Sequence, residues 1–117
     1  MTPTQLTLRH LRADGWPLVE VVEHWNPHAR IRQDMFGFVD VIAVRRGETL
    51  AVQTTSAANV SSRIRKIAEH PNVGAVREAG WTIRVHGWRL EDRKGHACKH
   101  QDRCGCRWEL YWDQDIS

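Results

Sequence analysis

Apolar and polar positions along the chain predict helices in two regions. Leucines at positions 6, 8 and 11 mark a helix over residues 3–14, and Gly15 can adopt the left-handed conformation that ends it. A second helix begins at about Asn59, because the apolar residues after it recur at i, i+4, i+7 and i+8 on one helical face. Pro71 breaks this helix and can start another, which ends at Ala79.

Stretches that are rich in valine or alternate between apolar and polar residues predict the strands. They cover residues 16–25, 38–45, 49–56, 81–90 and 108–114. The second has apolar residues on both faces, which is typical of a central strand, and a glycine turn joins it to the third as a hairpin. The predicted order is α-β-β-β-α-β-β, which gives a single α/β domain with a mixed sheet and helices on its faces.

Length and composition limit the class of protein. The chain has 117 residues, of which 41% are hydrophobic, the usual size and content of one globular domain. No apolar run approaches the ~18 residues of a membrane span, and the N-terminus lacks the apolar core of a signal peptide. We therefore expect a cytoplasmic protein with no membrane partner.

Positive charge is concentrated in the middle of the chain. The net charge is +3, and arginine supplies 14 of the 17 basic residues. Between residues 30 and 66, seven basic residues outnumber three acidic ones, whereas the remainder of the chain is slightly acidic. This distribution favours an anionic partner, with nucleic acid first. The alternative is a solvated surface that is rich in arginine.

Polar residues interrupt the apolar hairpin formed by residues 38–56. Gln53 and Thr55 share one face of their strand because side chains alternate, and Asp40 on the adjacent strand can point to the same face. Burying them without partners would cost a few kcal/mol, so they need a hydrogen-bonding network or a metal. Carboxylate and carbonyl oxygens suit Mg²⁺, which makes Asp40 and Gln53 candidate magnesium ligands. The alternative is a salt bridge or cap for Asp40 and a cross-strand hydrogen bond for the other pair.

This segment resembles the active-site region of the PD-(D/E)XK nuclease superfamily. The pattern G-x-x-D-V-I-A-V, a short turn and apolar-x-Q-x-T-S is most similar to the Holliday junction resolvase branch and its phage and bacterial relatives. The resemblance covers about residues 3–90. It implies a restriction-endonuclease-like fold with an α-β-β-β-α-β core, extended here by a C-terminal strand. It also implies a homodimer that hydrolyses phosphodiester bonds of DNA, including branched DNA, with Asp40 as the strand acid.

The sequence departs from the family motif at three points. The family's E-x-K or D-x-K falls on Gln53 and Thr55, and the first helix offers Gln5 where many relatives have a glutamate. Gln53 can still donate an uncharged carbonyl oxygen to a metal. Thr55 cannot act as a cation or as a general base in the way that lysine does. A two-metal mechanism with a single firm carboxylate is hard to sustain.

Nearby residues can replace the missing groups. An acid can come from Glu20 or Glu23, of which strand parity lets only one face the site, or from Asp34 in the following loop. Lys66 or Arg63, on the helix after the hairpin, can supply the positive charge. The candidate catalytic residues are Asp40, Gln53, Thr55, Glu20, Glu23 and Lys66. The candidate phosphate contacts are His28, Arg30, Arg32, Arg63 and Arg65. The loop that carries His24, His28 and Arg30 is expected to approach the site.

A cluster of cysteines and histidines lies in a polar insertion at about residues 91–107. The candidate zinc ligands are Cys98, His100, Cys104 and Cys106, with His96 as an alternative to either of the first two. Four protein ligands would close the site and make the Zn²⁺ structural. The spacings C-x-H and C-x-C are tighter than usual, and the alternative is a reduced loop with exposed thiols.

Three functions are compatible with these observations. The first is a Mg²⁺-dependent endodeoxyribonuclease with an altered active site. The second is a catalytically inactive nucleic-acid-binding module on the same fold. The third is a zinc-stabilised domain that binds other proteins.

Overall fold

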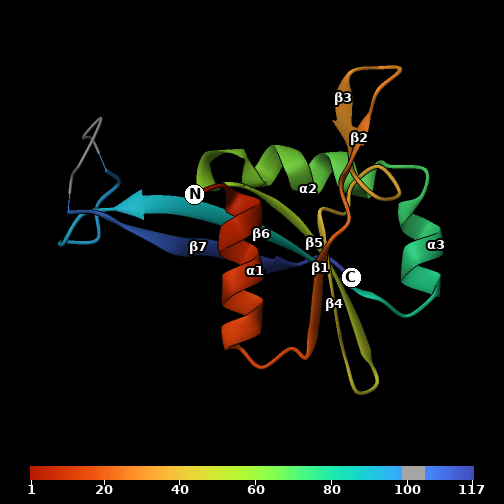
Figure 1. Ribbon diagram of the computed structural model, residues 1–117, viewed down its shortest axis with the longest axis horizontal. Coiled ribbons are helices and arrows are strands. Elements are labelled where there is room, and N and C mark those ends of the chain that lie inside the picture. Colours follow the sequence, from red (N-terminus) through yellow and green to blue (C-terminus); the bar gives the residue numbers. More distant parts are fainter. Residues whose placement is uncertain (99–104) are drawn as a thin grey trace.

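A mixed sheet of five strands organises the chain, in the order β1-β4-β5-β6-β7 (Figure 1). The computed structural model describes residues 1–98 and 105–117. The antiparallel pairs are β1 with β4, β4 with β5 and β6 with β7, whereas β5 and β6 are parallel. The strands are β1 (Leu18–Val21), β4 (Val41–Arg45), β5 (Glu48–Ser56), β6 (Thr82–Glu91) and β7 (Arg107–Asp115). The predicted α/β domain with a mixed sheet is confirmed.

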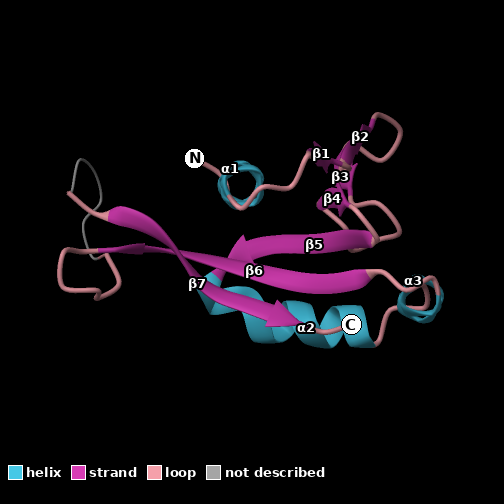
Figure 2. Ribbon diagram, turned by 90° about the horizontal axis from the view of Figure 1, so that it is seen from below, coloured by secondary structure: helices cyan, strands magenta, loops and turns pink. Residues whose placement is uncertain are grey.

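Helices cover both faces of the sheet (Figure 2). Helix α1 (Pro3–Ala13) packs on one face and begins with a capping box, in which Thr2 and Gln5 bond reciprocally. The opposite face carries α2 (Val60–Ala68), which follows a short 3₁₀ turn (Ala57–Asn59), and α3 (Val73–Glu78) lies beyond it. These helices form the crossover that two parallel neighbours such as β5 and β6 require. No helix in the described part of the chain is long and apolar enough to cross a membrane.

Strand β5 is buried because both of its faces are covered. Leu50 and Val52 pack under α1 with Leu11 and Trp16, whereas Ala51 packs with the side chains around α2. On the α2 side, a Cβ added at Gly87 would lie 2.3 Å from Val60 Cγ2. The helix can approach β6 this closely only because glycine has no side chain.

A buried hydrogen-bond chain fixes α1 to the last two strands. Trp88 Nε1 donates to Thr7 Oγ1 at 2.9 Å, and the same hydroxyl lies 3.1 Å from His86 Nδ1. On the other side of the ring, His86 Nε2 lies 3.2 Å from Asp113 Oδ1. That hydrogen bond, with Arg84 beside it, lowers the pKa of Asp113 to about 2. These contacts connect α1 to β6 and β6 to β7.

The main difference from the sequence predictions lies between β1 and β4. The expected strand over residues 16–25 ends at Val21, and the chain then forms a separate hairpin of β2 (His24–Asn26) and β3 (Ile31–Gln33). Neither of these short strands has a buried face, so they leave no alternation in the sequence. The next predicted strand also starts late, at Val41, because residues 35–39 form a tight turn.

Candidate functional site

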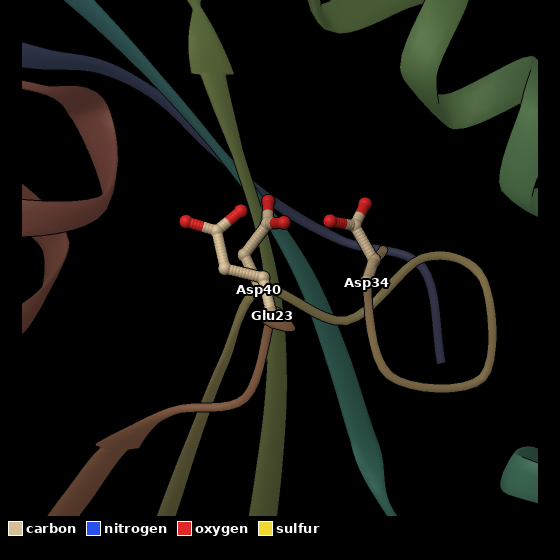
Figure 3. A group of neighbouring side chains, drawn as sticks. All are labelled: Glu23, Asp34 and Asp40. Atoms are coloured by element: carbon tan, nitrogen blue, oxygen red, sulfur yellow. The ribbon is translucent and has the colours of Figure 1, made fainter. Parts of the chain in front are cut away.

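Three acidic side chains converge at one end of the sheet. One carboxylate oxygen from each of Glu23, Asp34 and Asp40 lies within 4.8 Å of the other two, and Figure 3 shows the three side chains near one another. Asp40 is buried, and the other two are half-buried. Oxygen ligands from three separate segments are the donor set that Mg²⁺ or Ca²⁺ uses, so the arrangement can hold a divalent cation.

Two successive chain reversals bring these acids together. The β2–β3 hairpin starts directly after Glu23 and ends directly before Asp34, so its two ends carry the first two acids. Met35 then pairs with Val39 across a second, tighter reversal, and Asp34 and Asp40 flank that pair. The convergence is therefore a consequence of local turns and not of distant elements that happen to meet.

The tight turn between Asp34 and Asp40 depends on Gly37. Its φ is +90°, in the left-handed region, and a Cβ there would lie 2.3 Å from His70 Nε2. Phe36 also has a positive φ of 57°, and its carbonyl oxygen accepts a hydrogen bond from Asn72 Nδ2 at 2.9 Å. The segment around α3 thus holds the turn from outside and fixes the spacing of the two acids.

Strand β5 supplies the donors that face Asp40. Asp40 Oδ2 accepts hydrogen bonds from Thr54 N at 2.8 Å, from Thr54 Oγ1 at 3.2 Å and from Gln53 Nε2 at 2.5 Å. Gln53 Nε2 also lies 3.4 Å from Asp34 Oδ2. Gln53 therefore uses its amide group to bridge two carboxylates.

The pKa of the Asp40 carboxyl is raised to about 7, first by burial and then by the Asp34 carboxyl beside it. The hydrogen bonds from Thr54 and Gln53 act in the opposite direction and do not compensate. At neutral pH this carboxyl therefore binds either a proton or another cation readily.

Positive side chains border the acids. A hollow of about 320 Å³ is lined by the three acids together with Gln53, Thr55 and Arg63. A second hollow of about 390 Å³ shares Asp34, Gln53 and Arg63 and adds Lys66 and His70. Arg63, Lys66 and His70 follow one another along α2 and just beyond its end at i, i+3 and i+7, which is one face of a helix. Arg63 and Lys66 make no ion pair with any acid in residues 1–98 and 105–117.

Most of the predicted catalytic residues lie in this region. Asp40, Gln53, Thr55 and Glu23 line the first hollow, and Lys66 lines the second. Glu20 does not contribute, because it is exposed opposite Ile42 in the β1–β4 pair and lines neither hollow. We expected the alternation of side chains along the strand to decide which glutamate faces the site. Alternation does not apply to Glu23, because β1 ends at Val21.

The predicted phosphate contacts separate into two groups. Arg63 lines both hollows, and Arg32 Nη1 lies 3.9 Å from Glu23 Oε1. His28 and Arg30 instead occupy the exposed turn of the β2–β3 hairpin, which projects away from the body in Figure 1. The expectation that this loop approaches the acids is wrong for His28 and Arg30, whereas His24 at the base of the hairpin shares a hollow with Asp34. Arg65 is exposed and lines neither hollow, since it lies two residues from Arg63 on another side of α2.

One residue at the site was not singled out from the sequence: His70, which lines the second hollow. His24, which the sequence analysis placed in the loop expected to approach the site, lines a third hollow of about 410 Å³ together with Asp34. His70 follows Arg63 by seven residues, which is a helical spacing. The signal was missed because Pro71, which directly follows, marked the end of the predicted helix.

The zinc prediction falls partly outside the described residues. His100 and Cys104 are among those not described, whereas Cys98 and Cys106 are half-buried beyond the ends of β6 and β7. Zinc binding by this segment stays a prediction.

No family model, curated protein or solved structure matches the chain. Its function is therefore argued from the geometry of the site.

Proposed function

We propose that this protein is a metal-dependent nuclease that hydrolyses phosphodiester bonds of DNA. In this proposal Glu23 and Asp34 supply the carboxylates that β5 lacks. One observation carries the proposal: three carboxylates within 4.8 Å of one another share a hollow with an arginine that has no acidic partner in the described chain. An acidic centre bordered by free cations matches the charges of a metal and a phosphodiester.

The order and direction of the elements support membership of the PD-(D/E)XK superfamily. With the β2–β3 hairpin set aside, the chain runs through α1, three antiparallel strands, a helical crossover and β6 parallel to β5. This order of elements is consistent with the α-β-β-β-α-β core that the sequence resemblance implies. Asp40 lies at the start of the second core strand, and Gln53 and Thr55 lie on the third.

The residues fit Mg²⁺, which would be held by Asp40 and Asp34 with Glu23 as the third ligand. The bound ion would polarise the phosphodiester and lower the pKa of a water molecule. A divalent cation also offsets the crowding of negative charge that raises the pKa of Asp40. Three oxygen ligands and a raised pKa at the buried one are the features that make the fit.

The other side chains have roles that follow from their positions. Gln53 holds Asp40 and Asp34 at a fixed separation through its amide group. Arg63 binds the scissile phosphate and stabilises the negative charge that develops on it, and Lys66 contacts a neighbouring phosphate. Thr55 stands where relatives have lysine, so the positive charge moves from β5 to α2.

The deciding experiment is cleavage of linear and branched DNA by purified protein with Mg²⁺ or Mn²⁺. We expect cleavage by the wild type and a loss of at least about 100-fold in Asp40→Asn, Asp34→Asn and Glu23→Gln. Glu20→Gln is the matched control, because this acid lies on β1 outside the hollow, and it should cut like the wild type. Absence of cleavage on every substrate would refute the proposal.

A second function is favoured by one specific contact. Because Gln53 Nε2 donates to Asp40 at 2.5 Å, the acids have a hydrogen-bonding partner without a metal. The fold would then serve as a nucleic-acid-binding module without catalysis. DNA binding that falls with salt but is unchanged by EDTA, together with no cleavage, would identify this alternative.

A further inference from the structure

The β2–β3 hairpin is not explained by packing. It forms its own two-stranded sheet and projects from the body of the molecule (Figure 1). Trp25 and Ile31 on it are 56% and 52% exposed, and only Asn26 is half-buried. A two-stranded hairpin without a core is at best marginally stable in water, so a role in binding is the better reason for these exposed apolar side chains.

Local hydrogen bonds nevertheless hold the hairpin in one shape. Asn26 Oδ1 accepts from His28 N at 3.0 Å and from Ala29 N at 3.2 Å, which closes the turn. Arg30 has a φ of 54°, and this left-handed residue returns the chain into β3. The arm is therefore organised before any partner arrives, which lowers the entropy cost of binding.

Charge is separated along this segment. Residues 24–33 contain two arginines, two histidines and no acid, whereas Glu23 and Asp34 stand at the two ends of the hairpin. A hollow of about 410 Å³ at the base of the hairpin is lined by His24, Arg32 and Asp34, among others, and so joins the basic arm to the acidic centre. A ligand that contacts both the β2–β3 hairpin and the acidic centre must therefore place negative charge at the hairpin and bring a cation to the acids.

We propose that the β2–β3 hairpin binds a DNA strand with unpaired bases beside the acidic centre, with the Trp25 ring stacked on a base. Trp25 is directly opposite Arg32 in the strand register, so the two side chains lie on one face of the hairpin. Arg32 contacts the phosphate next to the stacked base, and Arg30 contacts a phosphate farther along the strand. Bases stacked inside a duplex have no free face, so the preferred ligand is single-stranded DNA. This inference rests on the proposed function of the acidic site.

Binding of a single-stranded oligodeoxynucleotide and of its blunt duplex, both labelled with fluorescein, tests the inference in EDTA at low salt. Stacking on one base changes affinity by roughly five- to a hundredfold. We expect Trp25→Ala to weaken single-strand binding at least about tenfold and duplex binding less than about twofold. Trp25→Phe should keep most of the affinity because it retains an aromatic face. Trp112→Ala is the matched control, since this tryptophan is 45% exposed on β7 at the edge of the main sheet.

Three outcomes would overturn the inference. They are an unchanged affinity of Trp25→Ala, an equal loss for single strand and duplex, and an equal loss in Trp112→Ala. Circular dichroism of each variant separates these from unfolding. If the alanine variant fails to fold, Trp25→Leu, which keeps an apolar side chain without an aromatic face, should show the same loss of single-strand binding and takes its place. The metal-dependent cleavage controlled by Asp40 is measured separately. A wild type that cuts DNA with no role for Trp25 would refute this inference alone, whereas a wild type that never cuts would refute the proposed function.

Discussion

At the scale of single residues, the site is governed by the Asp40 carboxyl. Its pKa of about 7 lies above the ordinary value of 3.8, so the folded protein binds this proton more tightly than the unfolded chain does. Without metal, the resulting stability is complete below about pH 4 and is lost as the pH rises through 7. Added Mg²⁺ should restore stability above pH 7, because it favours the ionised carboxylate.

Asp40→Asn should therefore stabilise the metal-free protein at pH 8, by an amount on the order of 1–3 kcal/mol, while cleavage is lost. The asparagine oxygen can still accept from Thr54, and its amide group can donate to Asp34. Urea unfolding in EDTA at pH 8 and pH 4 measures this, and the advantage should vanish at pH 4. An asparagine variant that is less stable at pH 8 would contradict the raised pKa.

A second residue-scale prediction concerns Gln53. Gln53→Glu removes the amide donor that bridges Asp40 and Asp34 and adds a fourth carboxylate. We expect a lower melting temperature in EDTA, because like charges repel in a half-buried site, and a larger rise on adding Mg²⁺ than in the wild type. Thermal unfolding with and without Mg²⁺ measures both. Gln114→Glu on exposed β7 is the control, and an equal Mg²⁺ effect in both variants would argue against a metal at the acids.

Sequence reasoning found the half of the site that lies on regular strands. Gln53 and Thr55 follow from alternation along β5, and Asp40 follows from the hairpin through Gly47. Asp34 and Glu23 were named only as nearby substitutes, because their approach depends on two turns that no periodicity encodes. Turn geometry depends on backbone conformations that one sequence specifies weakly.

At the scale of elements, the turn of residues 35–39 determines the spacing of the acids. Gly37→Ala should destabilise the protein by about 2–4 kcal/mol, because alanine is strained at this φ and its Cβ would collide with His70. Gly15→Ala is a matched control, since Gly15 has a φ of +91° but nothing within 4 Å of an added Cβ. Urea unfolding of both variants isolates the collision. Equal losses would mean that His70 moves aside.

The β2–β3 hairpin beside this turn was not predicted from the sequence. The long elements were predicted because each buries one face or both: α1, β5 and β6 differ from their expected bounds by one or two residues. Strands β2 and β3 have three residues each and no buried face, so they lack the alternation that indicates a strand. They were assigned instead to the end of a longer strand and to a loop. Strands that bury no apolar face produce no hydrophobic periodicity in the sequence.

At the scale of the whole molecule, the charge pattern should determine how DNA is bound. Arg63 and Lys66 face the acids from α2, whereas Arg65 lies on the same helix but lines neither hollow. Each phosphate contact adds about 0.7–0.9 to the slope of log affinity against log salt concentration. Arg63→Gln and Lys66→Gln should each reduce that slope by about this amount, and Arg65→Gln should reduce it less.

Under the proposed function, substitutions of Arg63 and Lys66 should also differ in their effects on kcat and KM. Because Arg63 shares the hollow with all three acids and Lys66 does not, Arg63→Gln should lower kcat by about 10²–10³ with little change in Mg²⁺ affinity. Lys66→Gln should mainly raise KM, as expected for a contact that is equal in the ground and transition states. Arg63→Lys should recover part of kcat, since a charge remains without the planar fork. If Lys66→Gln instead abolished turnover while Arg63→Gln did not, Lys66 and not Arg63 would supply the positive charge that stabilises the transition state.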